Sequence, residues 1–524
     1  MSENQNKMVE NKDLSRYESF KKEEKTQGVR AESTCDFTLP DYMGDIKRLL
    51  KCSADCIPCN KFIGTDEISF LGTVNYRVMF LDSEDRITEA AFSSEYEHTA
   101  RRADNVIDAE IDARIQNLSV RLGGPRKISA RASLVLDISA QVGCAMARDV
   151  IPEGAEKYER TVDIHSAVYL PSVEREYAEQ IGRLDGVSAD EVEVIKCEAE
   201  FSVTSEKMIG YDVEVRGEGV IFALLRVGDE IIRMEKRLPY DAQLANESLT
   251  GEGGYPSAKI FVTSASVIVN DSGESENIAS AAASVVMSVT VECSGRIDMN
   301  LPLTVACDAF VPGKKCESTY ETFEYNRLVS MSRERKSCTF EVRKSEAEIP
   351  ELYDICEVDA EVSALERVER EDGTAACATV NFTVIARDKN GDFLSIKLPQ
   401  KYECEKICAS DNPPSIKLNV CAQSAEHDSE KLYLSCDVIE TLYSECSEKI
   451  PVVSAIYVND EAEGTGRVTV YYPEERDTLW SVAKKYSVCV TDVIKNNSPL
   501  ELASEKCAGE CSLNGLEKVL IIKK

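Results

Sequence analysis

Three stretches of this 524-residue chain share one design, in which an apolar strand pattern is followed by a charged turn. Residues 72–81 and 377–386 largely alternate between apolar and polar side chains, and residues 217–225 form a more continuous apolar run. Alternation with a period of two predicts β-strands that bury one face. The turns that follow, 82–86, 227–230 and 388–392, are rich in Asp, Glu, Gly and Asn, which favours tight hairpins.

A second predicted hairpin follows each of these stretches. The paired segments are 109–115 with 128–136, 258–262 with 283–287, and 416–420 with 431–436. The whole unit recurs roughly every 150 residues, whereas a solenoid repeats every 20 to 50, so we predict separate domains rather than one stacked array.

The predicted fold class is therefore mainly β, with three tandem β-rich, sandwich-like domains followed by a small β-α-α-β domain. The predicted boundaries are a mobile charged N-terminus at 1–30, β domains at 31–141, 161–293 and 338–447, linkers at 142–160 and 448–466, a linker with a connecting strand at 294–337, and the C-terminal domain at 467–524.

The C-terminal domain begins with a strand that leads into an amphipathic helix. Asp477 is the predicted cap of this helix, and Leu479, Val482, Ala483 and Tyr486 follow at the spacing of one apolar face. Thr491 is the predicted cap of a second helix, and Asn497 is expected to end it in a left-handed conformation. The β-branched run 519–522 supplies the closing strand.

These motifs resemble the LysM family, which binds N-acetylglucosamine polymers in a shallow groove. The resemblance lies in DTLW (477–480), VAKKY (482–486), VIKNN (493–497) and the final G-LEKVLII (515–522). It implies a partner-binding groove formed by Asp477, Thr478, Leu479, Trp480, Asn496, Asn497 and Leu500. The chain departs from the family at Pro473, at Arg476 and in the longer loop 508–514. Trp480, the only tryptophan, is either a core residue or an exposed anchor for a partner.

Composition narrows the range of partners and compartments. The formal charge is −32, with 61 basic and 93 acidic residues, which disfavours nucleic acid and anionic lipid. The first residues lack an apolar signal core and no apolar run is long enough to span a membrane, so a cytoplasmic protein without membrane insertion is expected. The 20 cysteines are then expected to be reduced thiols, many of them buried in strands, such as Cys293 and Cys436.

Three acidic β domains ahead of one LysM-like domain resemble the SPOCS-domain family of anaerobic endospore formers, and in particular its SipL-type coat morphogenetic proteins. A sequence echo between residues 39–46 (LPDYMGDI) and 349–355 (IPELYDI) supports the repeat. The resemblance implies a non-enzymatic scaffold of the mother-cell cytoplasm at the forespore surface and in the spore coat. Its implied partners are the ATPase that polymerises as the basal layer of the coat and other coat proteins.

Two other classes of function stay open on the sequence. A LysM-like domain also fits a protein that binds peptidoglycan or N-acetylglucosamine polymers. Cys52, Cys56 and Cys59 have the CxxxCxxC spacing of an iron–sulfur or zinc site, but they precede strands rather than the βα units of a radical-enzyme barrel. The three histidines fall in no catalytic motif. We therefore predict no enzyme activity, no catalytic residue and no cofactor, with the three cysteines as weak metal candidates.

Overall fold

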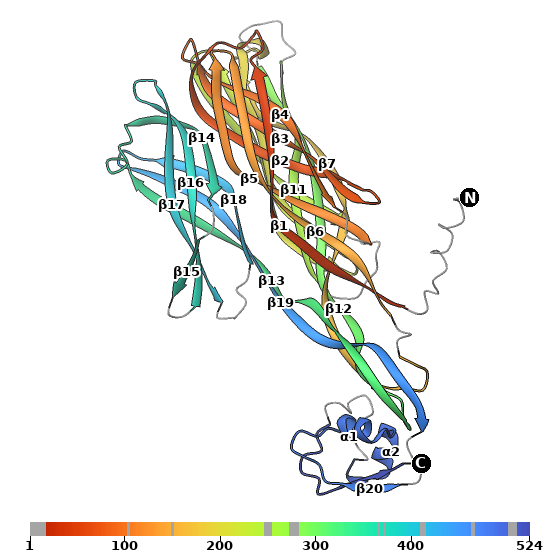
Figure 1. Cartoon of the computed structure of the whole chain (residues 1–524). Helices are drawn as coiled ribbons and strands as arrows, with labels where there is room; N and C mark the ends of the chain where they lie inside the picture. Colours follow the sequence, from red (N-terminus) through yellow and green to blue (C-terminus); the bar gives the residue numbers. More distant parts are fainter. Residues whose placement is uncertain are drawn as a thin grey trace, which may run out of the picture.

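The computed structural model describes residues 17–101, 105–147, 151–245, 254–271, 282–363, 366–370, 373–408, 415–462, 467–500 and 511–523. Most of these residues lie in long antiparallel strands, and two short helices lie near the C-terminus (Figure 1). The prediction of a mainly β chain with a terminal strand–helix–helix–strand element is confirmed. Among the described residues no helix is both long and apolar enough to cross a membrane.

The same arrangement of strands occurs three times along the chain. Repeat 1 contains β1 (Tyr17–Thr38), β2 (Ile46–Ile63), β3 (Glu67–Asp82), β4 (Ile87–Arg101), β5 (Val106–Gly124) and β6 (Lys127–Ala147). Repeat 2 contains β7 (Glu156–Asp185), β8 (Val192–Ile209), β9 (Asp212–Val227), β10 (Glu230–Leu244), β11 (Tyr255–Asp271) and β12 (Ala282–Phe310). Repeat 3 contains β13 (Lys314–Arg343), β14 (Leu352–Val362), β15 (Glu366–Arg370), β16 (Gly373–Asp388), β17 (Phe393–Cys408), β18 (Ser415–His427) and β19 (Lys431–Ala462).

Each repeat folds into two antiparallel sheets with matching strand orders. The first sheets are β1-β6-β5, β7-β12-β11 and β13-β19-β18. The second sheets are β2-β3-β4, β8-β9-β10 and β14-β16-β17, and β15 also pairs with β16. The predicted hairpins of all three repeats are confirmed, because β3–β4, β9–β10 and β16–β17 are joined by the turns 82–86, 227–230 and 388–392.

The sequence also shows why two of these turns are tight. Asp82 stands at the start of the first turn, and its carboxylate accepts hydrogen bonds from the backbone N–H groups of Glu84 and Arg86, both at 2.9 Å. Asp388 does the same in repeat 3 with Asn390 at 2.8 Å and Asp392 at 2.9 Å. An aspartate at the first position of a turn thus satisfies backbone donors that the sheet leaves open.

Several predicted boundaries were wrong because the first and last strands of the repeats are longer than expected. Residues 17–30 belong to β1, so this part of the predicted mobile N-terminus is a paired strand. The segment 294–337, predicted as a linker with one connecting strand, lies almost entirely in two strands, β12 and β13, and β19 extends through most of the predicted linker at 448–466. The predicted linker at 142–160 contains the end of β6 and the start of β7.

The extended strand ends form a stalk, which we define as residues 156–164, 301–310, 314–325 and 450–462. In Figure 1 these strands reach below the rest of the molecule towards the helices. Two ribbons, β7 with β12 and β13 with β19, face each other and bury a small apolar cluster. Its buried members are Val162, Ile164, Leu303, Val305, Cys307, Tyr325, Ile450 and Val452. Burial of these side chains keeps the residues in strands where linkers were predicted.

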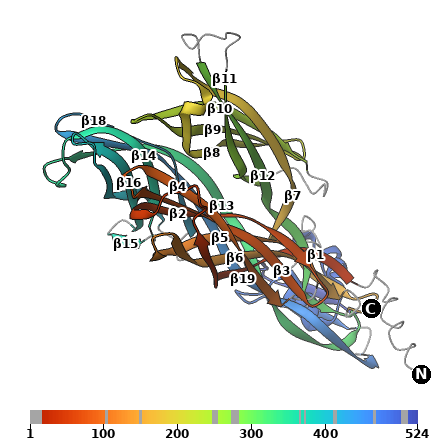
Figure 2. The ribbon, with the colours of Figure 1, turned by 90° about the horizontal axis from the view of Figure 1, so that it is seen from above.

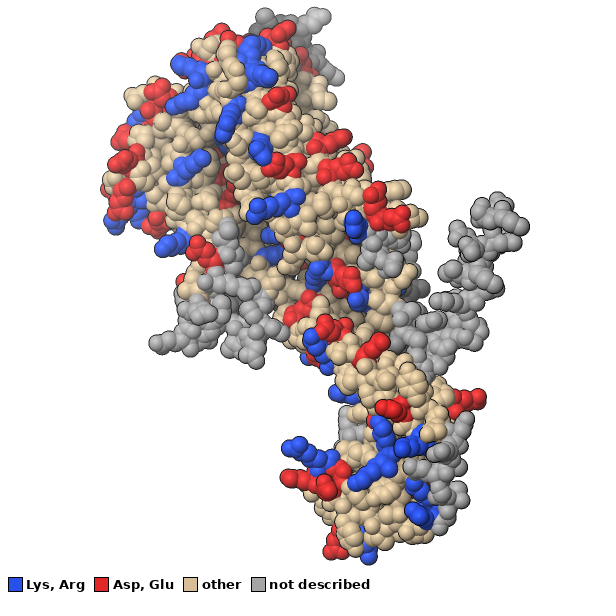
Figure 3. All heavy atoms as spheres, viewed as in Figure 1, with Lys and Arg blue, Asp and Glu red and all other residues tan. Residues whose placement is uncertain are grey.

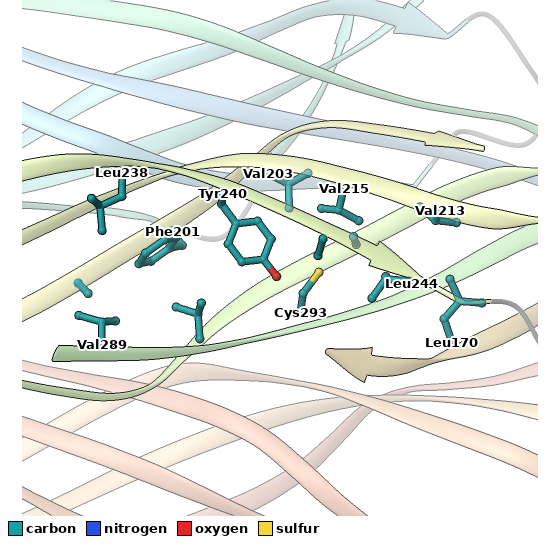
Figure 4. Packing of buried hydrophobic residues seen from close by; sticks show 14 of the residues in the cluster. Leu170, Phe201, Val203, Val213, Val215, Leu238, Tyr240, Leu244, Val289 and Cys293 are labelled. Atoms are coloured by element: carbon teal, nitrogen blue, oxygen red, sulfur yellow. The ribbon is translucent and has the colours of Figure 1, made fainter. Parts of the chain in front are cut away.

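Each repeat has an apolar core of its own, and that of repeat 2 is shown in Figure 4. Phe201, Tyr240 and Val289 meet between the two sheets, and Cys293 lies beside Tyr240. Cys293 is fully buried, and burial raises the pKa of its thiol to about 11. Cys436 is buried in the core of repeat 3, where burial raises its pKa to about 12. The expectation that these two cysteines are buried is confirmed.

The three repeats are not arranged in a row along the molecule but surround a common centre. Seen from above in Figure 2, repeat 3 (teal), repeat 1 (red and orange) and repeat 2 (yellow and green) are grouped side by side. Residues of all three line a cavity of about 2500 Å³. One apolar cluster combines Leu50 and Met79 of repeat 1 with Leu224 of repeat 2 and Ile385 of repeat 3. The repeats therefore share a core as well as having their own.

A buried charge cluster lies next to this shared core. Lys51 of repeat 1 and Lys196 of repeat 2 both donate to Glu357 Oε1 of repeat 3, each at 2.6 Å. Only 1% of the Lys196 side chain is exposed. Burial opposes ionisation of Glu357, but the two lysines outweigh it and hold the pKa of this carboxyl at about 2. An ion pair with this little exposure is held only where partners from all three repeats are in place.

A second buried charge cluster joins the repeats near the stalk. His165 of repeat 2 lies between Asp298 of the same repeat and Glu445 of repeat 3, with ring nitrogen to oxygen distances of 2.9 Å to each. Lys25 of repeat 1 contacts Glu445 at 3.3 Å. Burial lowers the pKa of His165, but hydrogen bonds to the two carboxylates outweigh it and raise the pKa overall. The His165 and Asp298 side chains have no exposed surface, so no substrate reaches this histidine.

Glu357→Gln tests the energetic role of the first cluster. The unfolded chain protonates this glutamate near pH 4.5 and the folded protein only near pH 2, so its ionisation stabilises the fold above pH 4.5. We expect the substitution to lower the free energy of unfolding by about 3 kcal/mol at pH 7, because it removes one partner of a buried ion pair. The difference should shrink as the pH falls below 4.5 towards 2, as measured by denaturant unfolding.

The matched control is Glu324→Gln, which affects the exposed pair of Glu324 with Lys449 inside repeat 3. Surface pairs contribute less than about 1 kcal/mol, so this variant should unfold almost as the wild type does. Equal losses in both variants would contradict the role assigned to Glu357.

Candidate functional site: the C-terminal module

The C-terminal module comprises the described residues 467–500 and 511–523, which form two strands and two helices. Its elements are β20 (Val468–Tyr471), α1 (Leu479–Tyr486), α2 (Val490–Lys495), a 3-10 turn (Ser498–Leu500) and β21 (Val519–Ile522). β20 and β21 pair antiparallel, and the helices cover one face of this sheet. Leu479, Val482 and Ala483 are buried in the module and Tyr486 packs against them with part of its surface exposed, which confirms the predicted apolar face of the first helix.

The predicted caps of both helices and the predicted left-handed conformation of Asn497 were wrong. Thr478, not Asp477, caps α1: its hydroxyl accepts from Ser481 N at 3.1 Å, while the Ser481 hydroxyl accepts from Thr478 N at 3.0 Å. The Asp477 carboxylate instead accepts from the Tyr471 hydroxyl at 2.5 Å and from Glu474 N at 2.8 Å. A reciprocal Thr–Ser pair satisfies two backbone donors, which one aspartate at 477 does not.

The second helix differs in the same way. Thr491 lies inside α2, whose capping residue is Cys489, without a side-chain cap. The left-handed residue is Ser487, at the end of α1, with φ of 53°. Asn497 is not left-handed at a helix end but buried: its amide donates to Val493 O and Leu520 O, and Leu520 N donates to its Oδ1, all within 2.7–2.8 Å. Asn497 therefore ties α2 to β21.

Most of the predicted groove residues are used inside the protein. Leu479 and Leu500 are buried in the core of the module, and Asn497 makes the three internal hydrogen bonds described above. Asp477, Thr478 and Asn496 keep part of their surface exposed. At these positions the predicted groove is filled by the core of the module or held by internal hydrogen bonds.

Trp480 lies in the interface between the module and the stalk. Its ring packs against Phe310 of β12, with ring centroids 5.1 Å apart, and against Tyr158 of β7, at 5.7 Å. Only 6% of the residue is exposed. Of the two roles left open for this tryptophan, the structure supports the buried one, and its partners come from another part of the chain.

One carboxylate holds the module to the stalk. Asp308 of β12 accepts hydrogen bonds from Trp480 Nε1 at 2.8 Å, from Lys484 Nζ at 2.6 and 2.8 Å, and from the Tyr320 hydroxyl at 2.6 Å. Burial opposes ionisation of Asp308, but these donors outweigh it and lower the pKa of the carboxyl. A backbone hydrogen bond of 2.7 Å from Gly313 N to Ser487 O adds to the contact. We call this set of contacts the latch.

The module exposes an apolar face on the side away from its helices. Val468 and Val470 alternate along β20, Tyr472 directly follows the strand, and the three have 65%, 48% and 69% of their surface exposed. Val468 pairs with Ile522 and Val470 with Leu520, so the side chains of both pairs lie on the same face of the sheet. We call Val468, Val470, Tyr472, Leu520 and Ile522 the outer face. It differs from the predicted groove, and its signal in the sequence is the alternation VTVYY.

The cysteine motif does not gather into a metal site. Cys52 and Cys56 lie on β2, and residues four apart on a strand are separated by roughly 13 Å. Both side chains contribute to apolar clusters inside repeat 1, and burial raises the pKa of Cys52 to about 11. The side chain of Cys59 lies outside the described residues. No group of three His, Cys, Asp or Glu side chains among the described residues is placed to hold a metal ion.

Comparisons with known proteins give no relative: no protein-family model, no curated protein and no solved structure matches the chain.

Asp308→Ala tests the latch, with the single tryptophan as its reporter. Loss of the carboxylate leaves Lys484 and the indole N–H without their acceptor, so we expect the module to separate from the stalk and Trp480 to meet water. Its fluorescence should shift to longer wavelength, and acrylamide should quench it several-fold more strongly. In the wild type the contribution of Asp308 to the latch should be lost only as the pH falls below its ordinary pKa of 3.8.

Asp36→Ala is the control, because Asp36 is an exposed aspartate on β1 of repeat 1. It should leave the emission unchanged. An Asp308→Ala protein whose tryptophan emission matches the wild type would show that the latch does not hold the module.

Proposed function

We propose that the chain is a non-enzymatic scaffold in endospore coat assembly. Its C-terminal module docks on the ATPase that polymerises as the basal layer of the coat, at the forespore surface on the mother-cell side. The three β repeats then hold or space other coat proteins. The module's sequence motifs suggest the family, and the outer face is the observation that carries the docking role.

The outer face suits a protein partner. Four of its residues are aliphatic and pair on one sheet, and Tyr472 directly follows β20, within a chain of net charge −32. On the visible face of the molecule acidic and basic side chains are interspersed (Figure 3), whereas the five residues of the outer face carry no charge. Exposed apolar patches rimmed by polar residues are typical of protein–protein contacts. Because the latch holds the opposite side of the module, the outer face points away from the stalk and is free to meet a partner.

The main alternative is binding of peptidoglycan or another N-acetylglucosamine polymer by the module. Two observations weigh against it. Trp480 is covered by Phe310 and Tyr158, and the Asn497 amide is fully used by backbone groups of the module. A sugar would have to displace these internal contacts before it reached either side chain.

Nothing in the described part of the chain favours the third alternative, an enzyme with an iron–sulfur or zinc site. Cys52 and Cys56 are too far apart to share an ion, and His165 is enclosed by its carboxylate partners.

Val470→Glu in the full chain tests the docking proposal. A charge in the middle of the outer face should weaken binding to the purified coat ATPase at least ten-fold, as measured by titration, because the carboxylate must be desolvated on docking. The fold should be kept, since the Val470 side chain is half exposed. Chitooligosaccharide is titrated in parallel, and we expect no binding.

Val329→Glu is the matched control, because Val329 is a valine of β13 with the same exposure of 48%, far from the outer face. It should bind the ATPase like the wild type. If both valine variants bind equally well, or if only the sugar binds, the proposed docking role is wrong.

A further inference from the structure

Residues at matching positions of the three repeats meet at the common centre. Lys51, Lys196 and Glu357 each follow a register shift in the first strand of the second sheet, and they pair with Met79, Leu224 and Ile385 respectively. The three residues are therefore equivalent by their place in the fold. The ion pairs of the first charge cluster join all three.

A second set of equivalent positions lies on β5, β11 and β18. Asp112, Lys259 and Lys417 pair with Asp137, Ser294 and Thr441 of the neighbouring strands. Asp112 of repeat 1 binds Lys259 of repeat 2 through Oδ1 and Lys417 of repeat 3 through Oδ2, both at 2.8 Å. A third set, Gln141, Asp298 and Glu445, comes four residues after Asp137, Ser294 and Thr441 on the same strands. Two of its members hold His165.

In neither of the first two sets do all three repeats carry the same charge. The first reads Lys, Lys, Glu and the second reads Asp, Lys, Lys. If one repeat occupied all three positions, the first set would bring together three like charges in a site with almost no exposed surface. Like charges at this separation repel strongly when they are shielded from water.

Three arginines connect the repeats, each donating a hydrogen bond to a backbone carbonyl of another repeat. Arg226 of repeat 2 donates to the carbonyl of Ile87 in repeat 1, Arg387 of repeat 3 donates to the carbonyl of Asp229 in repeat 2 at 3.4 Å, and Arg48 of repeat 1 donates to the carbonyl of Phe393 in repeat 3 at 2.5 Å. Arg226 and Arg387 are themselves equivalent, since they face Ile231 and Phe393 at the start of the next strand. Arg48 lies on the neighbouring strand and pairs with Leu81, the matching residue of repeat 1.

We infer that these charges let the repeats distinguish one another: the central charges pair when the head contains one copy of each repeat, and they do not pair when one repeat takes the place of another. The head, meaning β1–β19 without the stalk, thus closes from three unlike repeats of one chain and excludes a second copy of the same repeat. A second copy of one repeat in place of a different repeat changes the charges of at least one of the first two sets, so an exchange of unlike repeats between crowded chains disturbs the pairing. The inference does not depend on which partner the C-terminal module binds.

Permuting the second set in the full chain tests the inference. Asp112→Lys places lysine at all three positions and should lower the midpoint of thermal unfolding by at least about 3 °C. Adding Lys259→Asp gives Lys, Asp, Lys, the same charges moved by one repeat, and should recover more than half of the loss. Lys259→Asp alone completes the double-mutant cycle and should also be destabilising. High salt should narrow these differences, because the three groups are partly exposed.

Asp185→Lys is the control, since Asp185 forms an exposed pair with Arg183 inside repeat 2. It should change the midpoint little. If Asp112→Lys does not fold, Asp112→Asn in its place removes the negative charge without adding a third lysine and should show a smaller loss. A double variant as unstable as the sum of its single variants, or single variants no less stable than the control, would overturn the inference.

Discussion

Lys196 can stay ionised in the centre of this protein only because carboxylates surround it. Burial of a lone ammonium costs several kcal/mol, and Glu198 of its own repeat, Glu89 of repeat 1 and Glu357 of repeat 3 lie within 2.6–3.6 Å of its Nζ atom. His165 depends in the same way on Glu445 of another repeat. Separation of any one repeat would leave buried charges without partners. The electrostatics of the centre therefore make the head one body, and the positions of all other surfaces follow from that.

The stalk and the latch fix the position of the C-terminal module relative to the head. Asp308 stands near the tip of β12 and gathers an indole, an ammonium and a phenol, which fixes the orientation of the C-terminal module. The head and the outer face consequently lie at opposite ends of an elongated molecule (Figure 1). A scaffold that must hold components at a set distance from the layer on which it docks benefits from such a shape.

Local patterns predicted the elements well, and contacts distant in sequence account for the errors. The alternation in 72–81 and the aspartates of the turns report on neighbours a few residues away, and these predictions were confirmed. The stalk strands were missed because their stability comes from facing ribbons, such as Val162 against Ile450. The role of Trp480 could not be decided from its own segment, since its acceptor Asp308 lies 172 residues earlier. The charge sets at the centre carry no local signal either, because their members meet only after three repeats have closed.

The most direct test of this account is native-state hydrogen exchange of the full chain in increasing denaturant. The central strands β3, β9 and β16 belong to three different repeats but share one core and its charges. Their slowest amides should exchange through a single opening, with the same free energy and the same dependence on denaturant. If one of these strands lost its protection at clearly lower denaturant while the other two kept theirs, the repeats would be independent domains and the account would be wrong.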